Sequence, residues 1–172
     1  LADAGDWLGL MALAREALAL AQDVRDWDPR KAGTIYGWLG NGFRRMGDYE
    51  AARLMHEQHK AMSEELGDRA GVARACCNLG LCYDSTGDYA QARELHEQHK
   101  VICEELGDRA GAAKACGNLG TCYRSTGDYG RAREMHEQHK AMAEELGDRA
   151  GVARACSGLG LCYYSTGDYG RA

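Results

Sequence analysis

The stretch GDYAQARELHEQHKVICEELGDRAGAAKACGNLGTCYRSTGD, residues 87–128, contains one period of an internal repeat and decides the fold of this chain. Residues 87–126 and 127–166 match at 28 of 40 positions. A repeat period of about 20–50 residues, without the alternating pattern of β-strands, indicates a stack of helical units. The sequence therefore predicts an all-α fold, an α-solenoid built from antiparallel helix pairs.

Each period contains two expected helices. The first begins after Asp88 and ends at Gly107, and the second begins after Asp108 and ends at Gly127. An aspartate side chain accepts hydrogen bonds from the free N–H groups of a first helical turn, and its charge suits the positive helix end. Glycine adopts the left-handed conformation in which helices commonly end.

A leucine and a tyrosine four residues apart form the expected buried stripe of one helix in each period. They share a face of the helix, and the glycine next to the leucine allows a neighbouring helix to approach closely. Ala92 and Ala132 supply the small-residue contact from the other helix. The three copies of the stripe are Leu79, Gly80 and Tyr83; Leu119, Gly120 and Tyr123; and Leu159, Gly160 and Tyr163.

This pattern, C-x-x-L-G-x-x-Y … A, resembles the core pattern of the tetratricopeptide repeat family, with cysteine in place of a large aromatic residue. The first copy reads YGWLGNGF, with Phe43 in place of the tyrosine. The family's usual period is about 34 residues, so the longer period here implies longer helices. HEQHKAMAEELGDRAGVARACSGLG and GDRAGAAKACGNLGTCY are similar to the Pins/LGN subfamily of spindle-orientation scaffolds. The resemblance implies a right-handed superhelix of about eight helices.

The whole chain is expected to be one repeat array. Its first residues, with a helix at roughly 6–27, align with the second helix of a preceding repeat, and its last residues supply the first helix of an uncompleted repeat. Because a solenoid normally carries polar capping repeats, we interpret the sequence as a fragment of a longer array. The expected boundaries are 1–31, 32–68, 69–108, 109–148 and 149–172.

Composition and charge argue against several classes of protein. The net charge is −5, whereas nucleic-acid-binding proteins normally carry a basic face that neutralises phosphates. No apolar run approaches the ~20 residues of a membrane span, and the charged N-terminal stretch does not resemble a secretory signal. The cysteines recur with the repeat at positions expected to be interior, including Cys76, Cys116 and Cys156. We interpret them as reduced thiols of a cytoplasmic protein.

The motif HEQHK occurs at residues 56–60, 96–100 and 136–140 and places two histidines on one face of each helix. Zinc requires three or four converging ligands, but Glu97 points elsewhere and the nearby cysteines lie on the other helix. We therefore expect a partly buried ladder of imidazoles satisfied by hydrogen bonds, with no metal and no other cofactor. The alternatives are a metal site and a packing layer that responds to protons, because histidine titrates near neutral pH.

Catalysis is not expected. Cysteine and histidine can act as nucleophile and base, but nothing breaks the repeat to make one such pair unique, and a pattern copied in register indicates architecture. The glycine-rich stretch CGNLG lacks the lysine of a phosphate-binding loop and lies within an expected helix. The sequence therefore predicts no catalytic residues and a protein that is not an enzyme.

One face of the first helix of each repeat is expected to line a concave groove, because it lies opposite the Leu/Tyr stripe. This face carries basic residues within an acidic protein, together with asparagines that can bind an extended backbone. We predict that it binds a Glu/Asp-rich segment of a partner protein through charge-assisted contacts. In Pins/LGN-like proteins the corresponding residues bind Glu-rich segments, and the resemblance implies that role here. The candidate residues are Arg74, Asn78, Lys114, Asn118 and Arg154, with Arg44 and Arg124 along the edge.

A merely solvated face is one alternative to this groove, and a carboxylate clamp for chaperone tails, as in other tetratricopeptide domains, is another. Asn41, Asn78 and Lys114 match the clamp pattern, but Gly37 and Asn118 stand where a lysine and an arginine are required. The match is therefore partial.

Self-assembly is a further alternative. The exposed helices expected at the two ends are complementary halves of one repeat, so head-to-tail stacking would bury both and produce a homo-oligomer or an open filament.

Overall fold

Helices make up almost all of the described chain, which in this computed structural model comprises Gly9, Ala12, Glu16, Ala19, residues 29–168 and Gly170. The isolated residues at positions 9, 12, 16 and 19 are helical. The rest of the helix expected at 6–27 lies outside the described residues. Of the expected first segment, 1–31, residues 29–31 are described and are helical. The described helices are α2 (Pro29–Arg45), α3 (Tyr49–Glu65), α4 (Arg69–Thr86), α5 (Tyr89–Glu105), α6 (Arg109–Ser125), α7 (Tyr129–Glu145) and α8 (Arg149–Ser165).

Short turns built from a glycine and an aspartate connect these helices. Gly107 and Gly127 have φ angles of +69° and +82°, the left-handed conformation expected of them. The Asp88 carboxylate accepts from the backbone N–H of Gln91 at 3.2 Å, and the Asp108 carboxylate accepts from that of Gly111 at 2.8 Å. The predicted helix starts and ends in residues 87–128 are therefore confirmed.

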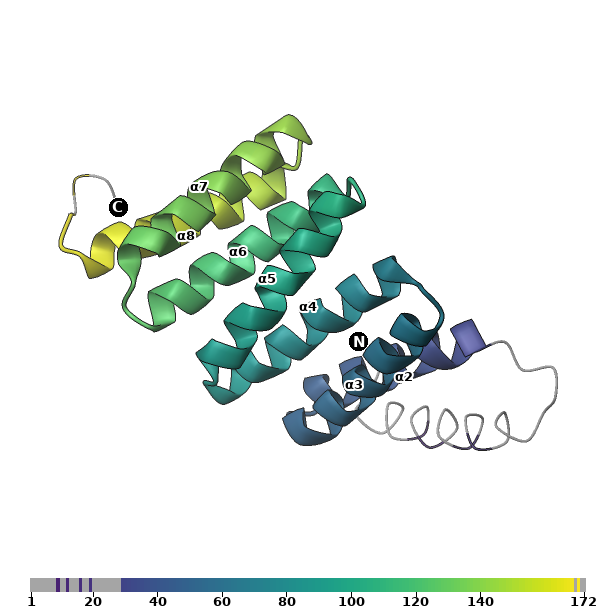
Figure 1. Ribbon diagram of the computed structural model, residues 1–172. Helices are drawn as coiled ribbons and strands as arrows, with labels where there is room; N and C mark the ends of the chain where they lie inside the picture. Colours follow the sequence, from purple (N-terminus) through teal and green to yellow (C-terminus); the bar gives the residue numbers. More distant parts are fainter. Residues whose placement is uncertain are drawn as a thin grey trace. The chain divides into compact units, whose positions relative to one another are not determined.

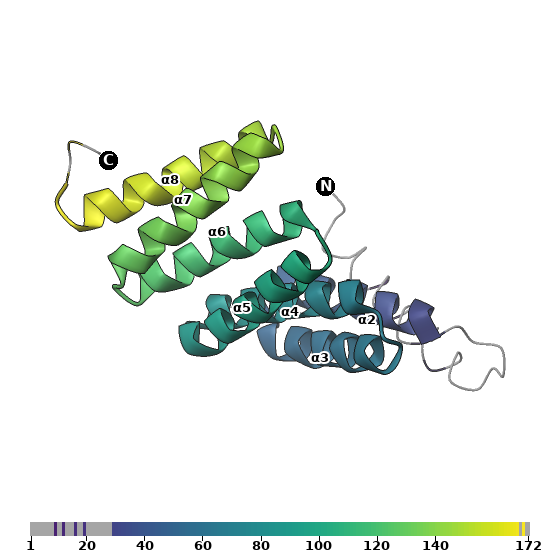
Figure 2. The same ribbon diagram turned by 45° about the horizontal axis from the view of Figure 1, so that its top comes forward.

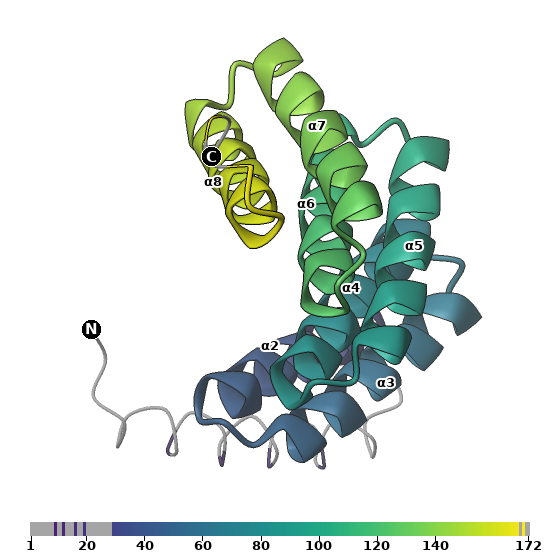
Figure 3. The same cartoon turned by 90° about the vertical axis from the view of Figure 1, so that its left-hand side faces the viewer.

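The described residues form two compact units that divide between Cys82 and Tyr83, within α4. In the first unit, α2 packs against α3 (Figure 1). In the second unit, α5, α6, α7 and α8 follow one another side by side in chain order (Figure 2). Both α6 and α8 lie against α7 (Figure 3), so that α7 brings these two helices together.

Each unit has a small hydrophobic core built from the predicted stripe. In the second unit Leu119 and Tyr123 of α6 pack with Ala132 of α7 and Cys162 of α8. In the first unit the corresponding residues of α2 and α3 are joined by a cysteine of α4, and the cluster comprises Leu39, Phe43, Ala52 and Cys82. The stripe prediction is confirmed for these residues, and Phe43 occupies the place of the tyrosine.

The cysteines differ in burial although they repeat in register. Seven of the eight free thiols are buried, but Cys156 is exposed, so the prediction of an interior position is wrong for that residue. Its counterpart Cys116 lies within 3.7 Å of Gln138 on the following helix, α7. Cys156 lies on α8, and within the described residues no later helix covers its face.

None of the helices α2–α8 combines the length and the apolar character that a membrane crossing requires.

Candidate functional site

A cavity of about 730 Å³ opens between α6 and α8 in the second unit, beside the histidines of α7. It exists because both helices pack on α7, where Gly117 of α6 lies against the ring of His139 and Gly158 of α8 lies against the ring of His136. Its polar and charged lining comprises Lys114, Asn118, Thr121 and Arg124 of α6, His136 and His139 of α7, Asp148 in the turn before α8, and Arg154 and Ser157 of α8.

Four of the seven residues predicted to bind a peptide line this cavity: Lys114, Asn118, Arg124 and Arg154. The other three belong to the first unit, where Arg44 lies partly buried on α2 and Arg74 and Asn78 lie on α4. The helix spacing of the predicted face therefore matches the cavity wall in the second unit. Two histidines in the lining, His136 and His139, were not among the predicted binding residues. The available signal was their position on α7, the helix against which both α6 and α8 pack.

The basic residues of the predicted face differ in how they are paired. Arg154 donates to the Asp148 carboxylate at 3.3 Å, and Arg74 donates to the Asp68 carboxylate at the same distance. Within the described residues Lys114 forms no ion pair, and the equivalent Asp108 accepts from the thiol of Cys103 and the backbone of Gly111. Lys114 therefore offers its charge to a ligand, whereas Arg154 must exchange partners.

The six histidines of the HEQHK motifs are buried, and glycines make room for the rings of His56, His59, His136 and His139. A Cβ atom on Gly120 of α6 would lie 2.6 Å from the ring of His136, and one on Gly158 of α8 would lie 2.5 Å from it. Such distances do not occur between real atoms, so this ring occupies space that a methyl group would need. In the first unit Gly40 has the same relation to His56. The glycine of the L-G-x-x-Y stripe therefore admits an imidazole ring between the helices.

Most of these imidazoles lack protein hydrogen bonds, which contradicts the prediction of a satisfied ladder. Within the described chain neither ring nitrogen of His56 or His136 has a partner, and Nδ1 of His59, His99 and His139 has none. For His56 and His136 the reason is that the groups around the ring are helical glycines and an arginine, Arg44 or Arg124, which has no acceptor.

Burial keeps these imidazoles neutral. It lowers the pKa of His56 and of His136 to about 4, and in each case the neighbouring histidine and an arginine lower the pKa further. Burial also lowers the pKa of His99 to about 4, helped by His96 and Lys114 and opposed by Asp108. The second histidines of the other two motifs, His59 and His139, have pKa values that are lowered chiefly by burial.

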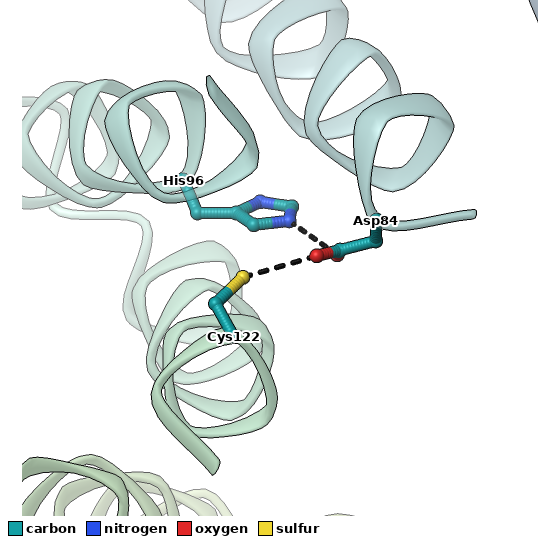
Figure 4. Close-up of side chains that lie close together, drawn as sticks. All are labelled: Asp84, His96 and Cys122. Carbon is teal, nitrogen blue, oxygen red and sulfur yellow. Dashed lines mark hydrogen bonds and ion pairs between the residues drawn. The ribbon is translucent and has the colours of Figure 1, made fainter. Parts of the chain in front are cut away.

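His96 is the exception, because it belongs to a cluster with Asp84 and Cys122 (Figure 4). Nε2 of His96 lies 3.0 Å from Oδ2 of Asp84, and the Cys122 thiol donates to Oδ1 of the same carboxylate at 3.1 Å. On the other side of the ring, Nδ1 lies 3.4 Å from the amide nitrogen of Asn118. The side chains come from the end of α4, from α5 and from α6, so the helix packing of the second unit assembles them.

The chemistry of this cluster is not that of a nucleophile with its base. The thiol contacts the carboxylate and not the imidazole, and burial together with that hydrogen bond raises the pKa of Cys122 well above its usual value. A thiol acts as a nucleophile in its ionised form, so this arrangement keeps Cys122 unreactive. Sequence reasoning did not single out Asp84. The available signal was its difference from Arg44, Arg124 and Tyr164 at the equivalent positions.

Comparison with known proteins identifies the class. The profile of the tetratricopeptide repeat matches residues 31–105, 86–145 and 111–172, and the chain therefore belongs to the tetratricopeptide repeat family. Its fold is accordingly an all-α helical-repeat solenoid. No curated protein matches the chain.

Several solved structures share this fold. BtubC (BKLC) from P. vanneervenii is 28% identical, with a TM-score of 0.88 over 98% of this chain and 69% of that one. The apo form of RapI is 13% identical, with a TM-score of 0.87 over 96% of this chain and 46% of that one. Aspartyl phosphate phosphatase F from Bacillus subtilis is 20% identical, with a TM-score of 0.82 over 94% and 42%. This chain thus spans less than half of the latter two, whose likeness at such identity concerns the fold alone.

Proposed function

We propose that this chain is a non-enzymatic protein-interaction scaffold whose cavity between α6 and α8 binds an acidic segment of a partner protein. The tetratricopeptide repeat fold supports the general role of an interaction scaffold. The acidic ligand and its place are the specific part of the proposal. The observation that carries it is the convergence of Lys114, Arg124 and Arg154 on one cavity in a protein whose net charge is −5.

The arrangement of these groups suits an extended peptide. Lys114 is exposed and without an ion pair among the described residues, so a Glu or Asp side chain gains a charge-assisted hydrogen bond there. The Asn118 amide can donate to and accept from a peptide backbone. Ser157 is small and leaves room for the backbone of the ligand between the two helices, while Gly117 and Gly158 accommodate the histidine rings of α7.

The first unit carries a second, smaller set of the same groups, and we include it in the proposal as a separate contact region. Arg74 is exposed and paired with Asp68, and Asn78 lies one helical turn away on α4. Arg44 on α2 completes the predicted set. The Pins/LGN-like resemblance supports acidic ligands for both regions and remains a prediction at the level of the subfamily.

Calorimetric titration with a short synthetic Glu-rich peptide tests the proposal. The double variant Lys114→Glu/Arg124→Glu reverses two charges of the cavity. We expect it to weaken binding by about tenfold to a hundredfold for each lost charge-assisted contact. The matched control is Lys100→Glu/Lys140→Glu, which makes the same change in net charge outside the cavity lining. Equal weakening by the two double variants, or no binding to the unmodified chain, would refute the cavity as the site.

Light scattering over a hundredfold range of protein concentration separates peptide binding from self-assembly. Under the proposal the mass is constant and rises by one peptide. A mass that grows with concentration would favour head-to-tail stacking, for which the exposed Leu161 and Tyr164 on α8 supply apolar surface.

We also propose a cytoplasmic setting and no nucleic-acid ligand. Eight free cysteines, including the exposed Cys156, suit a reducing compartment. The negative net charge opposes binding to phosphate backbones.

A further inference from the structure

We propose that Asp84, His96 and Cys122 form a binding site for one zinc ion, with ligands that lie outside the lining of the peptide cavity. Their potential ligand atoms all lie within 4.8 Å of one another, and they come from three different helices (Figure 4). Three converging protein ligands are the minimum that zinc sites use, with water in the remaining position of the tetrahedron.

The donor atoms and their spacing suit zinc. Zinc bonds to sulfur at about 2.3 Å and to imidazole nitrogen or carboxylate oxygen at about 2.0–2.2 Å, so tetrahedral donors lie roughly 3–4 Å apart. The Asp84 carboxylate already lies 3.0 Å from Nε2 of His96 and 3.1 Å from Sγ of Cys122. Insertion of the ion therefore requires small side-chain rotations and no rearrangement of the helices.

The charge balance of the site is also favourable. On binding, the Cys122 thiol releases one proton to solvent and becomes a thiolate, so thiolate and carboxylate together cancel the charge of Zn²⁺. A neutral complex is suited to a place where His96 and Cys122 are buried. The positive charge of Arg93 on α5 acts on the site and repels the metal ion. The Asp84 side chain is 18% exposed, which leaves solvent a path for the ion and for the water ligand.

A supporting contact orients the imidazole. In a zinc-bound state His96 coordinates through Nε2 and carries its hydrogen on Nδ1, which lies 3.4 Å from the Asn118 amide. Rotation of that amide presents its oxygen as the acceptor. Metal-bound histidines generally donate their second N–H to such a partner.

The neighbouring repeats provide an internal contrast. His56 and Cys82 in the first unit, and His136 and Cys162 in the second, recur at the same positions, but an arginine stands where Asp84 supplies the carboxylate. Within the described residues no second group of three such ligands occurs. The geometry therefore assigns one site to the part of the chain that the structure describes.

Titration of the full chain with Co²⁺, followed by competition with Zn²⁺, tests the site. We expect one Co²⁺ per chain, with thiolate-to-cobalt charge-transfer absorption, tetrahedral d–d bands and release of one proton. Asp84→Asn and Cys122→Ala should each weaken binding by at least about a hundredfold, and Asn118→Ala by about tenfold. The matched control Cys162→Ala removes the equivalent thiol of the next repeat and should leave the spectrum unchanged. Far-ultraviolet circular dichroism establishes that each variant is folded.

The proposal is overturned if the folded chain binds no Co²⁺, or if Asp84→Asn retains the spectrum. Loss of the absorption in Cys156→Ser would overturn it as well, because it would assign the metal to the exposed thiol. Peptide affinity does not enter these readouts. Asn118 is the residue that both proposals use, and the Asp84 and Cys122 variants test the zinc site without changing the cavity lining.

Discussion

The surroundings of His96 and of His136 differ sharply although both residues lie in identical HEQHK motifs of the second unit. Nε2 of His96 contacts the Asp84 carboxylate and Nδ1 contacts Asn118. His136 lies beside Arg124 and is enclosed by two helical glycines, and neither of its ring nitrogens has a partner in the described chain. The motif thus fixes where the ring lies, while positions outside the motif decide its chemistry.

A buried polar group without a hydrogen bond costs roughly 1–3 kcal/mol. His136 has this cost, and its ring packs closely against both neighbouring helices. His96 avoids the cost because the Asp84 carboxylate lies within hydrogen-bond distance of its ring. Four predictions follow from this contrast, in order of decreasing effect.

Acid should unfold the protein through its unpaired histidines. The pKa values of His56, His99 and His136 are about 4 in the folded state, against 6.5 ordinarily. Below pH 6.5 the unfolded chain therefore binds more protons, and stability falls as the pH drops towards 4. Each histidine contributes roughly 3 kcal/mol to this loss. Urea unfolding at pH values from 7.5 to 4 measures it.

His136→Gln is the control for that titration, because it removes one of the protons taken up on unfolding. Its stability curve should be less steep between pH 6.5 and 5 than that of the unmodified chain. A free energy of unfolding that is constant over this range would show that the rings are not held neutral.

Gly120→Ala should disrupt the surroundings of His136. The new Cβ atom meets the buried ring at 2.6 Å. Overpacking of this kind destabilises by about 1–3 kcal/mol, which outweighs the gain in helix propensity. Gly130→Ala is the matched control. Its Cβ atom meets only a carboxylate oxygen at 3.7 Å, and the preceding repeat has Ala90 there. This control should stabilise by up to about 1 kcal/mol, as thermal unfolding would reveal. Similar shifts for both variants would contradict the close ring contact.

Exchanging the charged residues at positions 84 and 124 should exchange the surroundings of His96 and His136. Asp84→Arg removes the hydrogen bonds to His96 and Cys122, and we expect a loss of about 1–2 kcal/mol. Arg124→Asp replaces a cation beside His136 by an anion, which should raise the pKa of that imidazole and reduce the loss of stability in acid. NMR titration of the ring protons measures the pKa. An unchanged His136 titration in Arg124→Asp would show that position 124 does not control it.

The outer surface should show almost no difference between the two repeats. Lys100–Glu104 and Lys140–Glu144 are partly exposed ion pairs at 3.8 and 3.6 Å, and Lys100 also donates to Gln138 of α7 at 3.2 Å. Removing either lysine with alanine should cost about 0.2–0.5 kcal/mol, less at high salt. Chemical denaturation of both variants measures their free energies of unfolding. A loss above 1 kcal/mol in one of them would indicate a role beyond the surface pair.

The sequence predicted the helices, their caps and the Leu/Tyr stripe because these depend on local chemistry that repeats with the chain. It also predicted that Lys114, Asn118, Arg124 and Arg154 share a region, since helix spacing alone places most of them on one face. It could not predict the hydrogen-bond state of the histidines. That state depends on which side chain of another helix, such as Asp84 or Arg124, faces each ring, and helix packing decides this.

Cys156 and Asp84 show two further limits. A repeated residue is buried only where the following helix covers it. Cys116 on α6 is buried, whereas Cys156 on α8, the last helix that the structure describes, is exposed. The cluster at Asp84 joins residues 12 and 38 positions apart along the chain. Only the packing of α4, α5 and α6 brings them together.

Asp84 also distinguishes one repeat from its copies during assembly. Residues 87–126 and 127–166 are identical at 28 of 40 positions, so pairing a helix with the wrong copy of its partner preserves most apolar contacts. Such shifted pairings are a common failure of repeat proteins. If His96 pairs with a copy that has arginine at the position of Asp84, the hydrogen bonds of the Asp84 carboxylate to His96 and Cys122 are lost. A single polar contact can fix alignment in this way, as a buried polar residue does in coiled coils, and we expect Asp84→Arg to increase misaligned refolding.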